Sequence, residues 1–123
     1  MNFTGIKNGK VEVFNEKFNL LRTIGNGDAL ESSLNTDGTL ALITTVNGEV
    51  ELWDEYCSLV LTIEDVDAKR ATFRGEEIII LTKNGTIESR KLNGEIIRVL
   101  NFSEPTDKSP KMKSNKTMLL KVE

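Results

Sequence analysis

GKVEVFNEKFNLLRTI, residues 9–24, decides the fold of this chain because the same sixteen-residue pattern returns twice without a gap. The copies are GEVELWDEYCSLVLTI at residues 48–63 and GTIESRKLNGEIIRVL at residues 85–100. Each copy follows an asparagine, and successive copies begin 39 and 37 residues apart. A repeat of this period indicates one structural unit that is copied and stacked along the chain.

Each copy reads as two strands joined by a tight turn. Val11 and Val13 of the first copy match Val50 and Leu52 of the second, and polar residues alternate with them. A period of two over four to six residues predicts a strand with one buried face. A second short apolar run follows a few polar residues later in every copy. In the third copy the connection contains Asn93-Gly94, which favours a two-residue hairpin turn.

Two further strands are expected before the second and third copies. The apolar runs 41–43 and 78–81 indicate strands that are buried on both faces. Weaker segments at 29–34 and 69–73 precede them, so each period predicts four short antiparallel strands. No ten-residue window combines a 3.6-residue period with helix caps, so we expect an all-β fold.

Residues 28–63 resemble a blade of the WD-repeat family of β-propellers. An acidic residue opens the segment, the turn NTDG follows at 35–38, and VELWD at 50–54 ends in the Trp-Asp dipeptide. The family's Gly-His dipeptide is missing because the chain has no histidine. The resemblance implies a β-propeller-like fold of four-stranded antiparallel blades, about three per chain. A small β-sandwich or meander with similar hairpins is the alternative.

The aromatic residue of the dipeptide changes between the copies. Phe14 and Arg90 stand where Trp53 does. We expect Trp53 to be buried between adjacent sheets, with Phe14 and the stem of Arg90 filling the same niche.

The repeat predicts one domain whose first blade is incomplete. The expected parts are a partial blade at 1–27, blades at 28–63 and 64–102, a linker at 103–115 and a closing strand at 116–123. The segment KTMLLKV at 116–122 resembles the strand that begins at Gly38. The tail is therefore expected to supply a strand that the first blade lacks.

Three blades cannot close a ring, because propellers typically have four to eight. We therefore predict a homodimer with six blades in total, since two-fold dimers are the commonest closed assembly. The residues expected to close it are Phe3, Ile6, Met118, Leu119, Leu120 and Val122.

No group of residues points to catalysis or to a bound cofactor. Cys57 has no histidine to activate it as a nucleophile. The NTDG segment at 35–38 lacks the later acidic ligands of a calcium loop and is interpreted as a turn. Asp65 and Asp67 lack a third ligand. We expect no enzymatic activity, no cofactor and no metal.

Composition and charge limit the kinds of partner that the chain is expected to bind. A net charge of −3 from well-mixed residues argues against nucleic-acid binding, and the lysines of the tail fit a solvated linker. The first fifteen residues contain no signal-like run, and no stretch reaches the length of a membrane span. We expect a cytoplasmic protein or an intracellular viral component that does not contact membranes.

The remaining function classes are binding and assembly. We expect a structural or protein-interaction module that forms a homodimer and takes a further protein partner. The alternative is a carbohydrate-binding, lectin-like propeller, in which Trp53, Tyr56 and Phe14 would form the sugar-binding patch.

Overall fold

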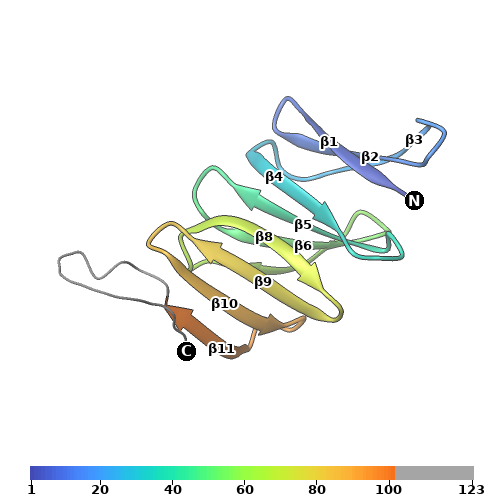
Figure 1. Ribbon diagram of the computed structural model, residues 1–123. Coiled ribbons are helices and arrows are strands. Elements are labelled where there is room, and N and C mark those ends of the chain that lie inside the picture. The colour runs from blue at the N-terminus through green and yellow to red at the C-terminus, as the bar shows by residue number, and fades with distance from the viewer. Residues whose placement is uncertain (102–123) are drawn as a thin grey trace, which may run out of the picture.

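The computed structural model describes residues 1–101, which form eleven strands and no helix. The strands are β1 (Phe3–Lys7), β2 (Lys10–Phe14), β3 (Leu20–Ile24), β4 (Ala29–Leu34), β5 (Leu40–Thr45), β6 (Val50–Asp54), β7 (Leu59–Ile63), β8 (Ala68–Arg74), β9 (Glu77–Thr82), β10 (Thr86–Lys91) and β11 (Ile96–Asn101). They build three antiparallel sheets, ordered β1-β2-β3, β4-β5-β6-β7 and β11-β10-β9-β8. The sheets are stacked in chain order, with β1 and β11 at opposite ends of the stack (Figure 1). The all-β prediction is confirmed.

The first sheet has three strands where the others have four. β1 pairs with β2 through Thr4 and Val13, in the way that β5 pairs with β6 through Leu42 and Leu52. β1 is thus the counterpart of a second strand, and the place of a first strand beside it is empty among residues 1–101. One backbone edge of β1 is therefore unpaired within the described part of the chain.

The hairpin between the last two strands of each sheet has the same geometry in all three copies. In the third copy the Gly94 amide donates to the Lys91 carbonyl at 2.9 Å, and the Lys91 amide donates to the Glu95 carbonyl at 2.8 Å. Only Gly94 of the Asn93-Gly94 pair has a positive φ, 94°. The predicted two-residue turn is therefore wrong: the loop has three residues and ends in a left-handed residue, the other common hairpin form.

The equivalent left-handed positions in the first two sheets are not glycines. Phe18 has φ of 69° and Cys57 has φ of 65°. Asn15 and Asp54 hold these two loops, because the side-chain Oδ1 of each accepts two backbone amides at 2.9–3.0 Å. Asp54 of the Trp-Asp dipeptide is thus a turn-forming residue.

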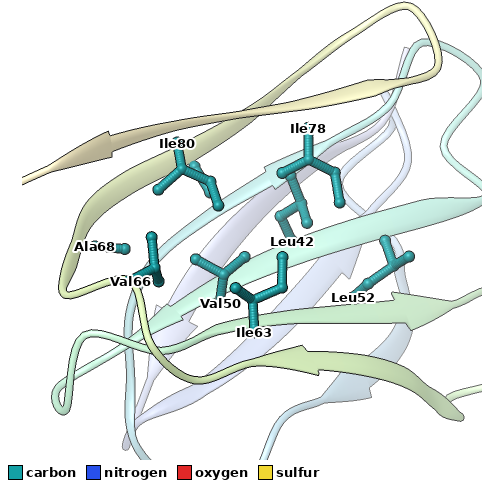
Figure 2. Close-up of a cluster of buried hydrophobic side chains, with 9 residues drawn as sticks. Leu42, Val50, Leu52, Ile63, Val66, Ala68, Ile78 and Ile80 are labelled. Atoms are coloured by element: carbon teal, nitrogen blue, oxygen red, sulfur yellow. The ribbon is translucent and has the colours of Figure 1, made fainter. Parts of the chain in front are cut away.

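The core lies in two layers between the sheets. The layer between the second and third sheets consists of Leu42, Val50, Leu52, Ile63, Val66, Ala68, Ala71, Ile78 and Ile80, all at most 6% exposed. Figure 2 shows these side chains pointing into the space between the two sheets. The layer between the first and second sheets consists of Val11, Val13, Ile24, Ala29, Ala41, Ile43 and Trp53. β5 contributes to both layers, which explains its continuous apolar sequence.

Backbone hydrogen bonds join each sheet to the next at repeat-equivalent places. The Ala29 amide donates to the Gly9 carbonyl at 2.8 Å, and the Ala68 amide donates to the Gly48 carbonyl at 2.7 Å. The contact at Gly9 is so close that a Cβ there would lie 2.1 Å from the carbonyl oxygen of Gly27. Gly9 also has φ of +75°, so glycine is required for two independent reasons.

Candidate interaction site at the two ends of the sheet stack

In the contact between the first and second sheets, the Trp-Asp strand of one blade is covered by the neighbouring blade. Trp53 is 7% exposed and packs with the apolar layer described above, which confirms its predicted burial between sheets. Its Nε1 donates to Oε1 of Glu51 at 3.0 Å, and Glu51 is 4% exposed. Asn26 of the connection between the sheets donates to the other carboxylate oxygen at 3.4 Å. A buried acid is thus satisfied by the tryptophan two residues later.

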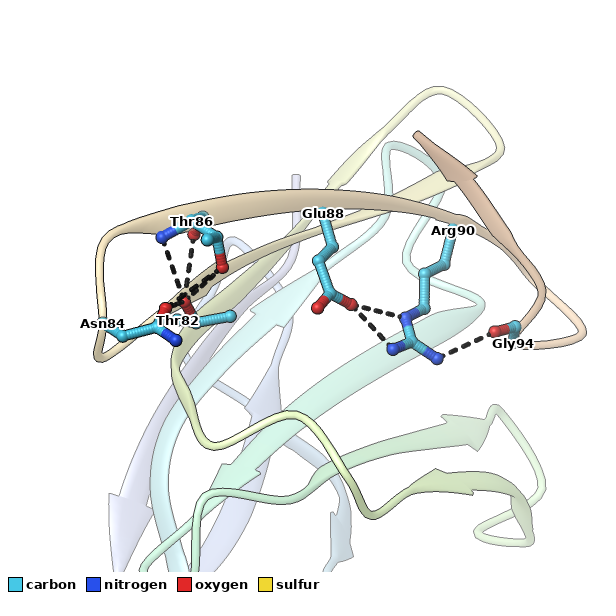
Figure 3. A network of polar contacts seen from close by, with 6 residues as sticks. All are labelled: Thr82, Asn84, Thr86, Glu88, Arg90 and Gly94. Carbon is cyan, nitrogen blue, oxygen red and sulfur yellow. Dashed lines mark hydrogen bonds and ion pairs between the residues drawn. The ribbon is translucent and has the colours of Figure 1, made fainter. Parts of the chain in front are cut away.

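The third sheet uses the same two positions with different chemistry. Arg90 donates to Oε1 of Glu88 through Nε at 2.9 Å and Nη2 at 2.7 Å, and Nη1 reaches the Gly94 carbonyl at 3.0 Å. Figure 3 shows this fork beside the β10–β11 hairpin. The Arg90 side chain is 13% exposed. A groove of about 630 Å³ remains beside Arg90, between β7 and the β10–β11 hairpin.

The role of the glutamate that precedes Trp53 and Arg90 by two residues was not predicted from the sequence. Glu12, Glu51 and Glu88 are repeat-equivalent and each precedes the aromatic or arginine position by two residues. The sequence signal was a glutamate that recurs two residues before Trp53 and Arg90, because both of these side chains can donate to a carboxylate. Phe14 has no such donor.

At one end of the stack, the outer face of the first sheet is aromatic. Val11 and Val13 point into the core, so Glu12 and Phe14 point away from it. Phe3 lies opposite Phe14 in the β1–β2 register, with ring centroids 5.4 Å apart and nearly parallel. The ring of Phe18 meets Phe3 edge-on at 5.1 Å. We call Phe3, Glu12, Phe14, Phe18 and Leu20 the head face.

A groove lies at the start of β1. It has a volume of about 490 Å³ and is lined by β1, the β4–β5 turn, Phe73 and Gly75. Phe3 and Ile6, two of the residues expected to close an assembly, lie on β1 and are 38% and 40% exposed. The other four, Met118, Leu119, Leu120 and Val122, lie outside the described residues.

At the opposite end, the outer face of the third sheet is mainly aliphatic. Ile78 and Ile80 are fully buried in the core, so the neighbouring residues of β9 face outward. The register of β9, β10 and β11 places five residues on this outward side, which we call the tail face: Ile79, Leu81, Ile87, Ser89 and Leu100. Ser89 is its polar member and donates to Oε1 of Glu77 at 2.8 Å. Leu100 is 42% exposed.

Three carboxyl or phenol groups within residues 1–101 have pKa values that are shifted by near neighbours. The amino terminus lies 2.8 Å from Glu16 and lowers the pKa of that carboxyl. The hydroxyl and amide of Thr39 lower the pKa of Asp37 within the β4–β5 turn. A hydrogen bond to Glu55 raises the pKa of Tyr56.

Residues 1–101 contain no acidic or cysteine cluster that could hold a metal ion, and Cys57 is exposed on its turn. The structure also separates the aromatic residues of the expected sugar patch. Trp53 is buried, Tyr56 is 79% exposed on the β6–β7 turn, and Phe14 lies on the head face. Within the same described stretch, no helix has the length and apolarity needed to span a membrane.

Comparison with known proteins identifies the fold. No protein-family model and no curated protein matches the sequence. Among solved structures, BamB from Moraxella catarrhalis matches with a TM-score of 0.67 and 18% identity, over 85% of this chain and 33% of BamB. BBS1N, solved in complex with ARL6DN, gives 0.66 and 11% over 77% of this chain and 31% of its own. Hsv2 from Kluyveromyces marxianus gives 0.69 and 16% over 82% and 36%.

These matches confirm the resemblance to WD-repeat-like β-propeller blades. The chain spans about a third of the length of each matched protein. Its three sheets therefore have the architecture of a propeller arc, in which each sheet is one blade and each face is built to contact a neighbour.

Proposed function

We propose that this protein is a non-enzymatic protein-interaction module whose propeller arc is completed by a second copy, giving six blades. The observation that carries the proposal is that one edge of β1 is unpaired among residues 1–101, so the first blade has an empty place there; a groove lies at the start of the same strand. An exposed strand edge is a template for pairing with another strand, and proteins normally cover or blunt it. The natural occupant of this place is an added β-strand.

The occupant that fits is the C-terminal segment 116–122 of the second copy. Its sequence KTMLLKV carries a short apolar run between lysines, as a strand at the edge of a sheet does. Its likeness to GTLALI at 38–43 is to the start of β5, whose place in the first blade β1 already fills, so the proposal rests on the empty edge and not on that likeness. A strand added within the same chain would leave the two outer faces uncovered, because they lie at opposite ends of the stack (Figure 1). A second copy can cover both outer faces of the first copy, and the C-terminal segment of each copy can fill the empty first-strand place of the other. Two-fold symmetry produces this closed arrangement.

One of the comparisons supports an interaction role. One of the matched propellers, BBS1N, was solved in complex with another protein, ARL6DN. Propellers host many functions, so the fold alone does not choose among them. Within residues 1–101 the buried Thr45 holds a turn and the buried Glu51 serves a contact between sheets. The lectin-like alternative gains no support, because its three aromatic residues do not form one patch.

Amide hydrogen exchange of the full chain tests the added strand. The amides of β1 that point away from β2 should be protected in the full chain and should exchange rapidly when residues 116–123 are deleted. Amides of β9 should be unchanged, since that strand is paired on both edges. Two proline variants distinguish loss of strand pairing from loss of chain length. Leu119→Pro removes a backbone amide of the proposed strand and should make the β1 amides exchange rapidly. Ser114→Pro lies in the expected linker and should leave their exchange unchanged. Equal exchange of these β1 amides in the full and shortened chains would contradict the proposal.

A further inference from the structure

We infer that the head face of one copy docks onto the tail face of a second copy, with Phe14 in the place that Trp53 occupies inside the chain. This inference deepens the proposed function and rests on it. The two internal sheet contacts are made by successive repeats of one sequence, so they show how a head face meets a tail face. Two copies can make the same contact if the head face and the tail face carry residues equivalent to those of the internal contacts.

The tail face matches the surface on which Trp53 already packs. Trp53 lies in one buried cluster with Val11, Val13 and Ile24 of the preceding sheet, which are at most 3% exposed. The repeat-equivalent residues of the third sheet are Ile87, Ser89 and Leu100. Two of the three are aliphatic and stand on the outward side of the stack, where residues 1–101 provide no cover. An apolar sheet face of this kind is ordinarily packed against another sheet.

The head face matches the surface that the second sheet presents to the first. Phe14 is equivalent to Trp53 by repeat spacing, and Phe3 is equivalent to Ala41 by strand register. The pair Ala41 and Trp53 of the second sheet thus corresponds to the stacked pair Phe3 and Phe14 of the first. Both pairs present a large apolar surface at the same place on the blade.

The docking also explains why one kind of contact suffices for closure. Head and tail are different surfaces at opposite ends of the chain, so a single copy offers one of each (Figure 1). Such head-to-tail contacts produce a closed ring when the rotation between copies closes. Two copies then share two identical contacts, and every blade has a neighbour on both faces.

A gain in affinity is the sharpest test, because Glu12 stands two residues before Phe14 just as Glu51 stands before Trp53. Phe14→Trp should restore the donor to this carboxylate and strengthen the dimer, lowering its Kd roughly tenfold. The matched control Val60→Trp adds the same ring to an exposed position on β7, away from both faces, and should leave the Kd unchanged. Analytical ultracentrifugation over a dilution series measures the two constants.

Charge substitution supplies the second measurement. Phe14→Lys and Leu100→Glu should each produce folded monomers, and the double variant should recover the dimer because lysine then meets glutamate at both contacts. If the wild-type chain is a dimer and both single variants remain dimers of unchanged Kd, the head-to-tail contact is wrong while the strand-added dimer stands. If the wild-type chain is a monomer, both proposals fail. If a charged variant unfolds, the Phe14→Trp dilution series decides alone: an unchanged Kd overturns the inference.

Discussion

Trp53→Ala removes the only tryptophan of the chain from the contact between the first and second blades. Truncating a packed large aromatic residue costs about 3–5 kcal/mol. The change also deprives the buried Glu51 of its 3.0 Å donor and leaves it with Asn26 at 3.4 Å. An underpaired buried group adds about 1–3 kcal/mol. The two costs overlap, so we expect unfolding free energy to fall by about 4–6 kcal/mol, a large share of the roughly 5–15 kcal/mol of a small domain.

Urea unfolding followed by far-ultraviolet circular dichroism measures this loss, because the variant lacks the tryptophan that fluorescence would follow. Protein concentration is held fixed, since assembly shifts the midpoint. Trp53→Phe keeps most of the ring and loses the donor, so it should cost about 1–3 kcal/mol. Tyr56→Ala, at a position 79% exposed, should stay within about 0.5 kcal/mol of wild type. A Trp53→Ala midpoint equal to that of Tyr56→Ala would refute the inter-blade packing.

Three further perturbations test the local geometry of the blades. Cys57→Gly should stabilise the chain by about 0.5–1 kcal/mol in thermal or urea unfolding, because Cys57 has φ of 65°, whereas Cys57→Ala should give no gain. Gly9→Ala should cost more than about 2 kcal/mol, because the new Cβ would lie 2.1 Å from a backbone oxygen; Gly75→Ala, with φ of +60° and nothing within 4 Å, should cost only about 1 kcal/mol, and equal costs would contradict the close contact. The lowered pKa of Asp37 means that its bonds to Thr39 stabilise the β4–β5 turn above the ordinary aspartate pKa of 3.8 and are lost as the pH falls through the lowered value. An NMR titration of the Asp37 carboxyl should therefore show a midpoint below 3.8 in wild type that rises in Thr39→Val, and equal midpoints would contradict this role.

Much of the fold follows from residue pattern. The gapless repeat places Val11, Val50 and Ile87 at one position of the blade, and the continuous apolar run 41–43 marks the strand buried on both faces. The same alignment predicts the burial of Trp53, because neighbouring sheets leave a niche for a large side chain. Here local sequence and tertiary packing favour the same structure.

The turns and polar contacts were harder to predict, for physical reasons. Asn-Gly permits two hairpin forms, and the number of loop residues is set by strand register and not by the dipeptide. Phe18 and Cys57 disfavour the left-handed conformation, so only their alignment with Gly94 signals it. The pairing of Glu51 with Trp53 depends on side chains that share one face of a strand, and the recurrence of Glu12, Glu51 and Glu88 was the available signal.

The mass of the full chain in solution tests the central claim most directly. Sedimentation equilibrium at micromolar concentration should give twice the 13.7 kDa of one chain, because two arcs of three blades complete each other. A mass of three chains would contradict the six-blade count. A stable mass of 13.7 kDa across the concentration range would contradict completion of the propeller by a second copy.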